Sequence, residues 1–200
     1  MEGEDLIISC NYRRGQFPTE LSEYHEVEIF RDRIDGWLLS IAEQVEIIPH
    51  AGFALLYLVS SYFEMIAQYV NGEDSDGRSK EYFAKGFREV YGESYLESSR
   101  IDLLLLYKGL RCAIYHSGLP RGNIVLSGAY ARAFESEGDM LKINPHILLK
   151  DVRNHFSGYI AKLLDQSEQA SRDNFLKRFH LACKVKLKRR SQMRPHPPPS

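Results

Sequence analysis

Apolar side chains recur at helical spacing through most of this chain of 200 residues, and this period constrains the fold more than any other feature. The clearest case follows Asn144-Pro145, where a good N-cap residue precedes a proline suited to the first helical turn. One face of the predicted helix carries the apolar residues Leu148, Val152, Phe156, Tyr159 and Leu163. A stripe of this width must pack against other helices.

The same spacing predicts further helices over residues 20–48, 51–70, 79–91 and 99–116, and from residue 171 onward. Thr19 is the predicted N-cap of the first helix, and Asn71-Gly72 ends the second. Between the fourth and fifth helices, Ile124-Val125-Leu126 and the turn Glu137-Gly138-Asp139 predict a small β-hairpin. The predicted fold class is therefore all-α: a bundle of about five to six helices with a small β-hairpin between the fourth and fifth.

Three regions are expected along the chain. Residues 1–18 are irregular, residues 19–183 form a single helical domain, and residues 184–200 form a basic, proline-rich tail that we predict to be disordered. Two hundred residues suffice for one domain with a well-packed core.

The net charge of -1 conceals two unlike halves. Residues 1–100 carry 19 acidic and 9 basic side chains, whereas residues 101–200 carry 8 acidic and 17 basic ones. A basic region of this kind is typical of proteins that meet nucleic acid or another polyanion, and the acidic half is suited to repel it.

Several classes of protein are not expected. The acidic start of the chain has no signal-peptide pattern, and the apolar run from Ala51 to Phe63 is too short to cross a bilayer, so we expect a cytoplasmic protein without a membrane partner. The cysteines form no CxxC pair, and neither a P-loop nor a GxGxxG motif is present. His25 lies among glutamates whose spacing does not gather metal ligands. We therefore expect no cofactor and no metal.

The predicted fourth helix, residues 99–116, is apolar on two faces. At about 100° per residue, the predicted core-facing side carries Leu103, Leu106, Tyr107, Leu110, Ala113 and Ile114. The other side carries Leu104, Leu105, Lys108, Cys112 and Tyr115. A helix that is apolar nearly all round is usually covered on both sides. The second face is therefore predicted to meet another helix or another subunit.

Arg111 and His116 flank this second face. An arginine fork binds phosphate oxygens in a bidentate way, and a histidine can move a proton to or from a ribose hydroxyl. Together they supply the minimal groups for cleaving a phosphodiester without a metal. Lys108 and Tyr115 are candidate supporting residues.

The run Arg111-Cys112-Ala113-Ile114-Tyr115-His116 resembles the Arg-x(4–6)-His motif of HEPN (higher eukaryotes and prokaryotes nucleotide-binding) domains, and the order of helices is similar from Trp37 to Leu181. The resemblance implies a metal-independent endoribonuclease of the toxin or phage-defence type, in which two motifs of a homodimer form one cleft. It also implies a nucleotidyltransferase-type antitoxin as a partner. Cys112 departs from the family pattern, because active members commonly carry Asn, Asp or His after the arginine.

Other interpretations stay open at the level of sequence. Arg111 can be a salt-bridged helix residue and His116 a residue stabilised by the helix dipole. The fold can then serve as a non-catalytic module that binds a partner protein or a nucleotide, which Cys112 favours. His155, on the polar side of the fifth helix, is interpreted as structural.

The basic C-terminal region has two interpretations. Between Arg172 and Arg194 there are nine Lys or Arg residues and one acid, Asp173. This stretch either solubilises the protein or follows an RNA backbone without reading its sequence. The candidate RNA-binding residues are Lys184, Lys186, Lys188, Arg189 and Arg190.

Overall fold

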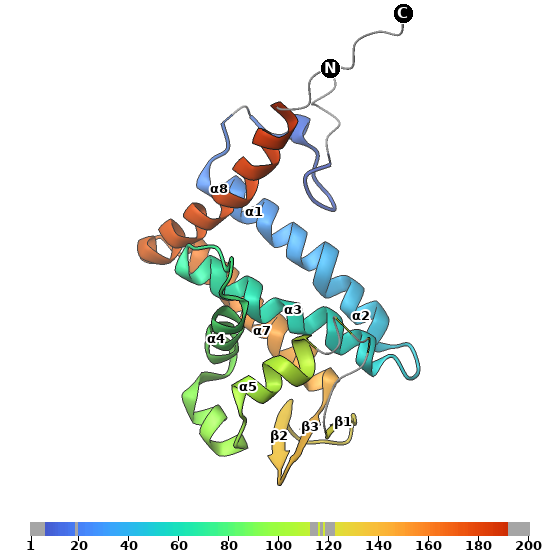
Figure 1. The fold of residues 1–200 in the computed structure, drawn as a ribbon. Coiled ribbons are helices and arrows are strands. Elements are labelled where there is room, and N and C mark those ends of the chain that lie inside the picture. Colours follow the sequence, from blue (N-terminus) through green and yellow to red (C-terminus); the bar gives the residue numbers. More distant parts are fainter. Residues whose placement is uncertain (1–6, 19, 113–115, 117, 119–122, 192–200) are drawn as a thin grey trace, which may run out of the picture.

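The structure is a computed structural model that describes residues 7–18, 20–112, 116, 118 and 123–191; of Arg111 and residues 183–191 it describes the backbone alone. The fold is a helical bundle with a small sheet at one end (Figure 1). The predicted fold class is thus confirmed: helices dominate, and the β element lies between α5 (Leu103–Leu106) and α7 (Pro145–Leu164).

Helix α3 (Gly52–Asn71) is the centre of the bundle. It packs against α4 (Ser79–Ser99) on one side and against α7 and α8 (Gln169–Ser191) on others, as Figure 1 shows. Its buried side chains include Leu56, Val59, Tyr62, Phe63 and Ile66. Gly72 ends the helix in the left-handed conformation (φ 68°), as the sequence predicts for an Asn-Gly pair.

Two helices at the N-terminal side form one long rod. Helix α1 (Glu23–Ile34) passes through a π-helical turn, Asp35–Leu39, into α2 (Ser40–Glu46). The predicted start at Thr19 and Glu20 differs from the observed one, since the Ser22 hydroxyl accepts the N–H of His25 and caps the helix there. Thr19 itself lies outside the described residues.

The segment predicted as one helix over residues 99–116 is divided. Helix α4 bends at Gly92 (φ 73°) and ends at Arg100, which is left-handed (φ 54°). Asp102 starts a new helix, α5, by accepting the N–H of Leu104 at 2.8 Å. The backbone then widens into a π-helix over Tyr107–Cys112. The predicted helix is therefore present over residues 103–112, but it begins four residues later than predicted and its second half is π-helical.

The β element has three strands, β1 (Ile124–Leu126), β2 (Phe134–Glu137) and β3 (Met140–Ile143), in the order β1-β3-β2. Strands β2 and β3 form the predicted hairpin, with Gly138 left-handed (φ 61°) in its turn. Strand β1 joins β3 in parallel, which the sequence pattern does not reveal. Phe134, Leu141 and Ile143 attach the sheet to the core.

The C-terminal helix is longer than expected. Helix α8 continues to Ser191, past residue 184 where the sequence predicts a disordered tail to begin. Residues 184–190 therefore continue a helix that is anchored at Phe175 and Phe179, which are buried against the bundle. Residues 192–200 lie outside the described part.

By length and composition, α3 is apolar enough to cross a membrane, and it is the one such helix among the described residues. Half of its most apolar window is buried inside the protein. Those side chains make up the bundle core, which accounts for the composition of the helix.

Candidate functional site

The π-helix Tyr107–Cys112 carries two of the sequence-predicted residues, Lys108 and Arg111. Leu106 and Leu110 are fully buried and anchor this segment to the bundle, while Leu104, Leu105 and Lys108 are exposed. The predicted division into a core-facing and an outer side is therefore confirmed for the described residues. π-helical turns are rare and occur often at functional sites, because the wider backbone is retained only where something requires it.

Of the two predicted catalytic residues, the structure describes the exposure of His116 but not the side chain of Arg111. His116 is exposed. The side chain of Arg111 and the whole of Tyr115 lie outside the described part, as do the side chains of Lys184, Lys186, Lys188, Arg189 and Arg190. A contact between Arg111 and His116 therefore stays a prediction.

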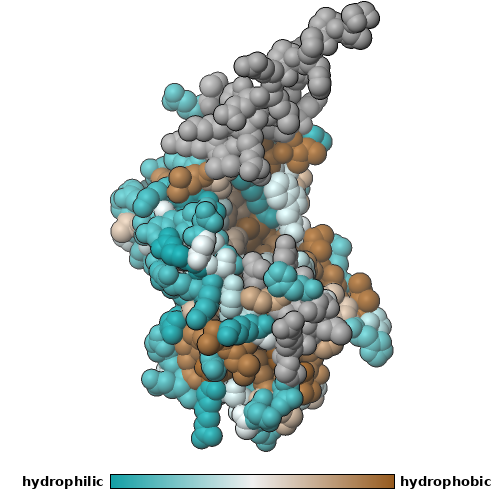
Figure 2. All heavy atoms as spheres, in the orientation of Figure 1, coloured by the Kyte–Doolittle hydropathy of each residue, from teal (hydrophilic) through white to brown (hydrophobic). Residues whose placement is uncertain are grey.

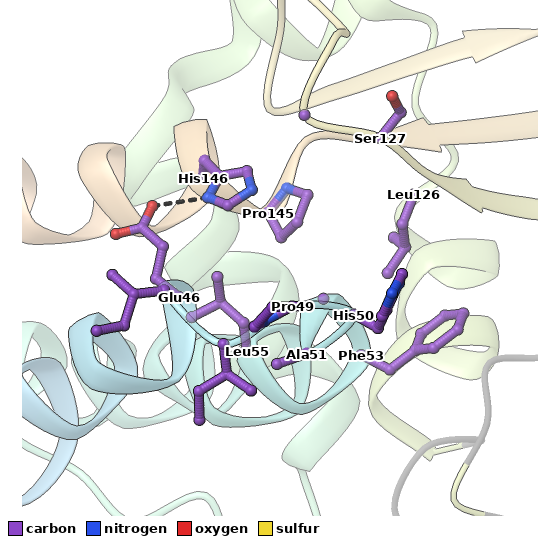
Figure 3. A pocket seen from close by; sticks show the side chains of 14 residues that line it. Glu46, Pro49, His50, Ala51, Phe53, Leu55, Leu126, Ser127, Pro145 and His146 are labelled. Carbon is purple, nitrogen blue, oxygen red and sulfur yellow. Dashed lines mark hydrogen bonds and ion pairs between the residues drawn. The ribbon is translucent and has the colours of Figure 1, made fainter.

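A pocket of about 540 Å³ opens at the junction of three segments that are distant in sequence. One wall is the connection from α2 to α3, the second is the last residue of β1 with the two residues after it (126–128), and the third is the first turn of α7 (Figure 3). This volume is within the range of about 300–1,000 Å³ that is typical of small-molecule sites.

A hydrogen-bonded pair lies at one end of this pocket. Nδ1 of His146 is 2.8 Å from Oε1 of Glu46, and both side chains are partly exposed. Because the carboxylate accepts the proton on Nδ1, the other ring nitrogen, Nε2, is left for a ligand. Figure 3 shows His50 at the other end, next to Phe53 and Leu126.

Local structure explains how these side chains are placed. Asn144 caps α7, accepting the N–H groups of His146 and Ile147 at 3.0 and 3.2 Å, and this puts His146 on the first turn. Arg153, farther along α7, lies 2.5 Å from a carboxylate oxygen of Glu43 on α2. This ion pair holds the end of α2, with Glu46, beside the start of α7.

His50 has an unusual backbone. It adopts the left-handed conformation (φ 65°), which non-glycine residues seldom do. It follows Pro49 and directly precedes the first turn of α3, so this turn directs the imidazole to the pocket (Figure 3). Backbone strain of this kind often accompanies a functional position.

Sequence reasoning missed this pocket. Glu46 and His146 are 100 positions apart, and no local pattern joins them. One signal was present: Asn144-Pro145 fixes the start of α7, which places His146 on its first turn. The second signal was Pro49-His50 between two apolar helices, which marks a tight connection.

His155 has the structural role that the sequence suggested, although it faces α3 instead of solvent. Its Nδ1 lies 2.8 Å from the Tyr62 hydroxyl. Burial lowers the pKa of His155 to about 4, so the ring is neutral near pH 7.

Two findings concern metal ligands and cysteines in the described part of the chain. No group of three or more His, Cys, Asp or Glu residues is arranged there to hold a metal ion. Cys10 and Cys112, the cysteines whose side chains are described, are both free.

No protein-family model, curated protein or solved structure matches the chain.

Proposed function

We propose that the protein is a metal-independent endoribonuclease that acts as a homodimer in the cytoplasm, as the resemblance to HEPN domains implies. The observation that carries this proposal is the π-helix Tyr107–Cys112, because the first two residues of the Arg-x(4)-His motif lie in a backbone form that is typical of functional sites. The exposure of Lys108 on this π-helix, and of His116 four residues beyond its end, supports it further.

The chemistry follows from the residue types. His116 takes the proton of the ribose 2'-hydroxyl as the 2'-oxygen attacks the phosphorus, or gives a proton to the 5'-oxygen that leaves. Arg111 binds the phosphate and stabilises the charge that develops on its oxygens. Lys108 and Tyr115 support the same phosphate. The products are a 2',3'-cyclic phosphate and a 5'-hydroxyl.

The homodimer supplies the second half of the site. Leu105 is 47% exposed and Leu104 lies next to it on α5, directly before the π-helix. Pairing these leucines with those of a second copy would bury them and bring two motifs together. RNA is the proposed substrate, and a nucleotidyltransferase-type antitoxin is the proposed partner that restrains the enzyme.

The decisive experiment measures cleavage of varied RNAs in EDTA. We expect the wild-type protein to cleave and His116→Ala to be at least about 100-fold slower, the usual cost of losing a general acid or base. His180→Ala is the matched control, because His180 is also exposed but lies on α8. Equal rates for wild type and His116→Ala would refute the catalytic role, and so would an inactive wild-type protein.

A second candidate is a non-catalytic module that binds a partner protein. It is favoured by apolar side chains exposed along α2 and the start of α3, which Figure 2 shows as brown surface on that side. This surface comprises Trp37, Ile41, Ile47, Ile48, Phe53 and Tyr57, with Ile47 82% exposed. Exposed apolar surface of this extent is typical of interaction sites. A monomeric protein that cleaves no RNA would favour this function.

A further inference from the structure

The pocket between α2, β1 and α7 is lined, among the described residues, by none from the segment of Arg111 and His116, and its chemistry points to a ligand. Its polar side chains are Glu46, His50, Ser127 and His146. Its apolar walls include Ile48, Pro49, Phe53, Leu126 and Pro145. A pocket with apolar walls and a few polar groups at its ends is the usual form of a binding site for a small organic molecule.

Nucleophilic chemistry by Ser127 is not supported. Its hydroxyl accepts the N–H of Ala129 at 3.1 Å, and in Figure 3 it points away from His146. The Glu46–His146 pair therefore has no serine to activate, and it is better suited to hydrogen bonding with a ligand.

The charges of the lining residues restrict that ligand. Among the described residues around the pocket there is no Lys or Arg, and Glu46 carries a carboxylate. An anionic group would lack a strong partner there, so the part of the ligand inside the pocket carries no negative charge. A carboxylate accepts hydrogen bonds only, which favours a ligand with N–H donors on one edge.

The walls favour a flat ring. Phe53 and His50 lie together at the end of the pocket opposite the Glu46–His146 pair (Figure 3). Aromatic side chains stack on the faces of nucleic acid bases and tolerate any base, since every base has a π-face. The two ends together match a molecule with aromatic faces and a polar edge.

We propose that this pocket binds one nucleobase, either in a free nucleoside or as an unpaired base of an RNA strand. Glu46 accepts N–H groups of the base edge. His146, oriented by its hydrogen bond to Glu46, contacts the same edge through Nε2. Phe53 and His50 pack on the ring. If the base belongs to an RNA strand, the pocket is part of the proposed ribonuclease function, and this reading rests on that function. Binding of a free nucleoside does not rest on it.

The test measures binding of guanosine, adenosine, cytidine and uridine, and of a short 2'-O-methyl oligoribonucleotide, by calorimetry with the full chain. The 2'-O-methyl group blocks cleavage, so binding is independent of any nuclease activity. We expect at least one of these probes to bind. Nucleoside binding identifies a free-nucleoside site, whereas binding of the oligonucleotide alone identifies an RNA source.

Substitutions of residues in the pocket test whether the probes bind there. Glu46→Gln should weaken binding at least about tenfold, the value of one hydrogen bond to a charged group. Phe53→Leu keeps an apolar wall but removes the aromatic face, and should weaken it several-fold. His146→Gln removes the imidazole that contacts the base edge and should also weaken binding. Its control is His180→Gln, because His180 forms a similar pair with Glu26 at 2.8 Å outside this pocket.

Two results would overturn the proposal: no probe binds to the wild-type protein, or Glu46→Gln binds as tightly as wild type while circular dichroism shows both folded. His116→Ala separates the two proposals. It should slow cleavage at least about 100-fold and leave the binding of the probes intact. If the wild-type protein cleaves no RNA, the nuclease proposal fails, but the proposed binding of nucleosides does not depend on that result.

Discussion

Gly86 of α4 touches the carbonyl oxygen of Phe63 on α3. A Cβ atom on Gly86 would lie 1.7 Å from that oxygen, and 2.5 Å from the carbonyl carbon. The two backbones are therefore in direct contact at this crossing, and Phe63 is fully buried beside it.

This contact predicts that Gly86→Ala destabilises the protein by at least about 3 kcal/mol, because two packed helices must separate to admit a methyl group. Gly158→Ala on α7 is the control, since a Cβ there meets no atom within 4 Å. It should stabilise the protein by about 0.5–1 kcal/mol through helix propensity. Urea unfolding measures both, and similar stabilities for the two variants would contradict the close crossing.

The buried His155 predicts a loss of stability in acid. Its pKa is about 4 in the folded protein and about 6.5 in the unfolded chain, so protons bind preferentially to the unfolded state. The stabilisation is complete above pH 6.5 and is lost as the pH falls through 4. We expect its contribution to be on the order of 2 kcal/mol, allowing for partial exposure.

His155→Gln checks this dependence, because Gln does not titrate and can still bond to the Tyr62 hydroxyl. Urea unfolding at pH 7 and pH 4.5 should show a smaller loss for this variant than for wild type. An equal loss in the two proteins would mean that His155 does not titrate as proposed.

Arg172 joins three helices and predicts a second stability effect. Its guanidinium donates to the carbonyls of Leu163 and Asp165 at 3.0 and 2.7 Å, and pairs with Glu23 of α1 at 3.2 Å. Arg172→Ala leaves these carbonyls without their donor and should cost about 2–3 kcal/mol. Arg172→Lys should recover only part of this, since Lys lacks the planar fork. Lys177→Ala, an exposed change on the same helix, should be nearly neutral in thermal unfolding.

The exposed leucines of α5 predict the oligomeric state. Analytical ultracentrifugation should show a dimer for the wild-type protein and a monomer for Leu105→Glu, because a carboxylate would be buried at the proposed interface. Tyr24→Glu changes a side chain on α1 that is more exposed than Leu105, and this variant should remain dimeric. A dimer that survives Leu105→Glu would place the interface elsewhere.

The basic end of α8 predicts salt-dependent RNA binding. One variant replaces five residues by alanine: Lys184, Lys186, Lys188, Arg189 and Arg190. It should bind RNA more weakly. The plot of log affinity against log salt concentration should also become less steep, by about one for each phosphate that the protein no longer neutralises. Alanine at the exposed Lys80, Lys150 and Lys177 is the control and should change the slope little. If the salt dependence of binding is the same in the five-residue α8 variant as in the wild-type protein, these five residues do not contact RNA and have a solubilising role.

Much of the fold could be predicted from local signals. Asn144-Pro145 marks the start of α7, Gly72 the end of α3, and Gly138 the turn of the hairpin, because each position has a backbone requirement that few residues meet. The π-helices could not be predicted, since the apolar spacing around them still resembles an α-helix. The bend at Gly92 falls directly after residue 91, where the sequence predicts the end of a helix.

The pocket could not be predicted for a different reason. Its chemistry depends on Glu46 meeting His146, and that contact arises only when α2 packs beside α7. Periodicity shows which face of a helix is buried, but not which helix covers it. The parallel pairing of β1 with β3 could not be predicted either. It joins two strands that are separated in sequence by β2, and periodicity does not show which strands pair.

The π-helix Tyr107–Cys112 has a consequence for how this segment can gain or lose a residue. A π-helical turn holds one residue more than an α-helical turn in the same rise. Deleting one residue within this segment would restore an α-helix, and because the wide turn absorbs the extra residue, the chain that follows would keep its present side. A single codon loss would thus leave the buried Leu106 and the exposed His116 on their present sides. In evolution, the extra residue can be gained or lost at this turn without turning His116 away.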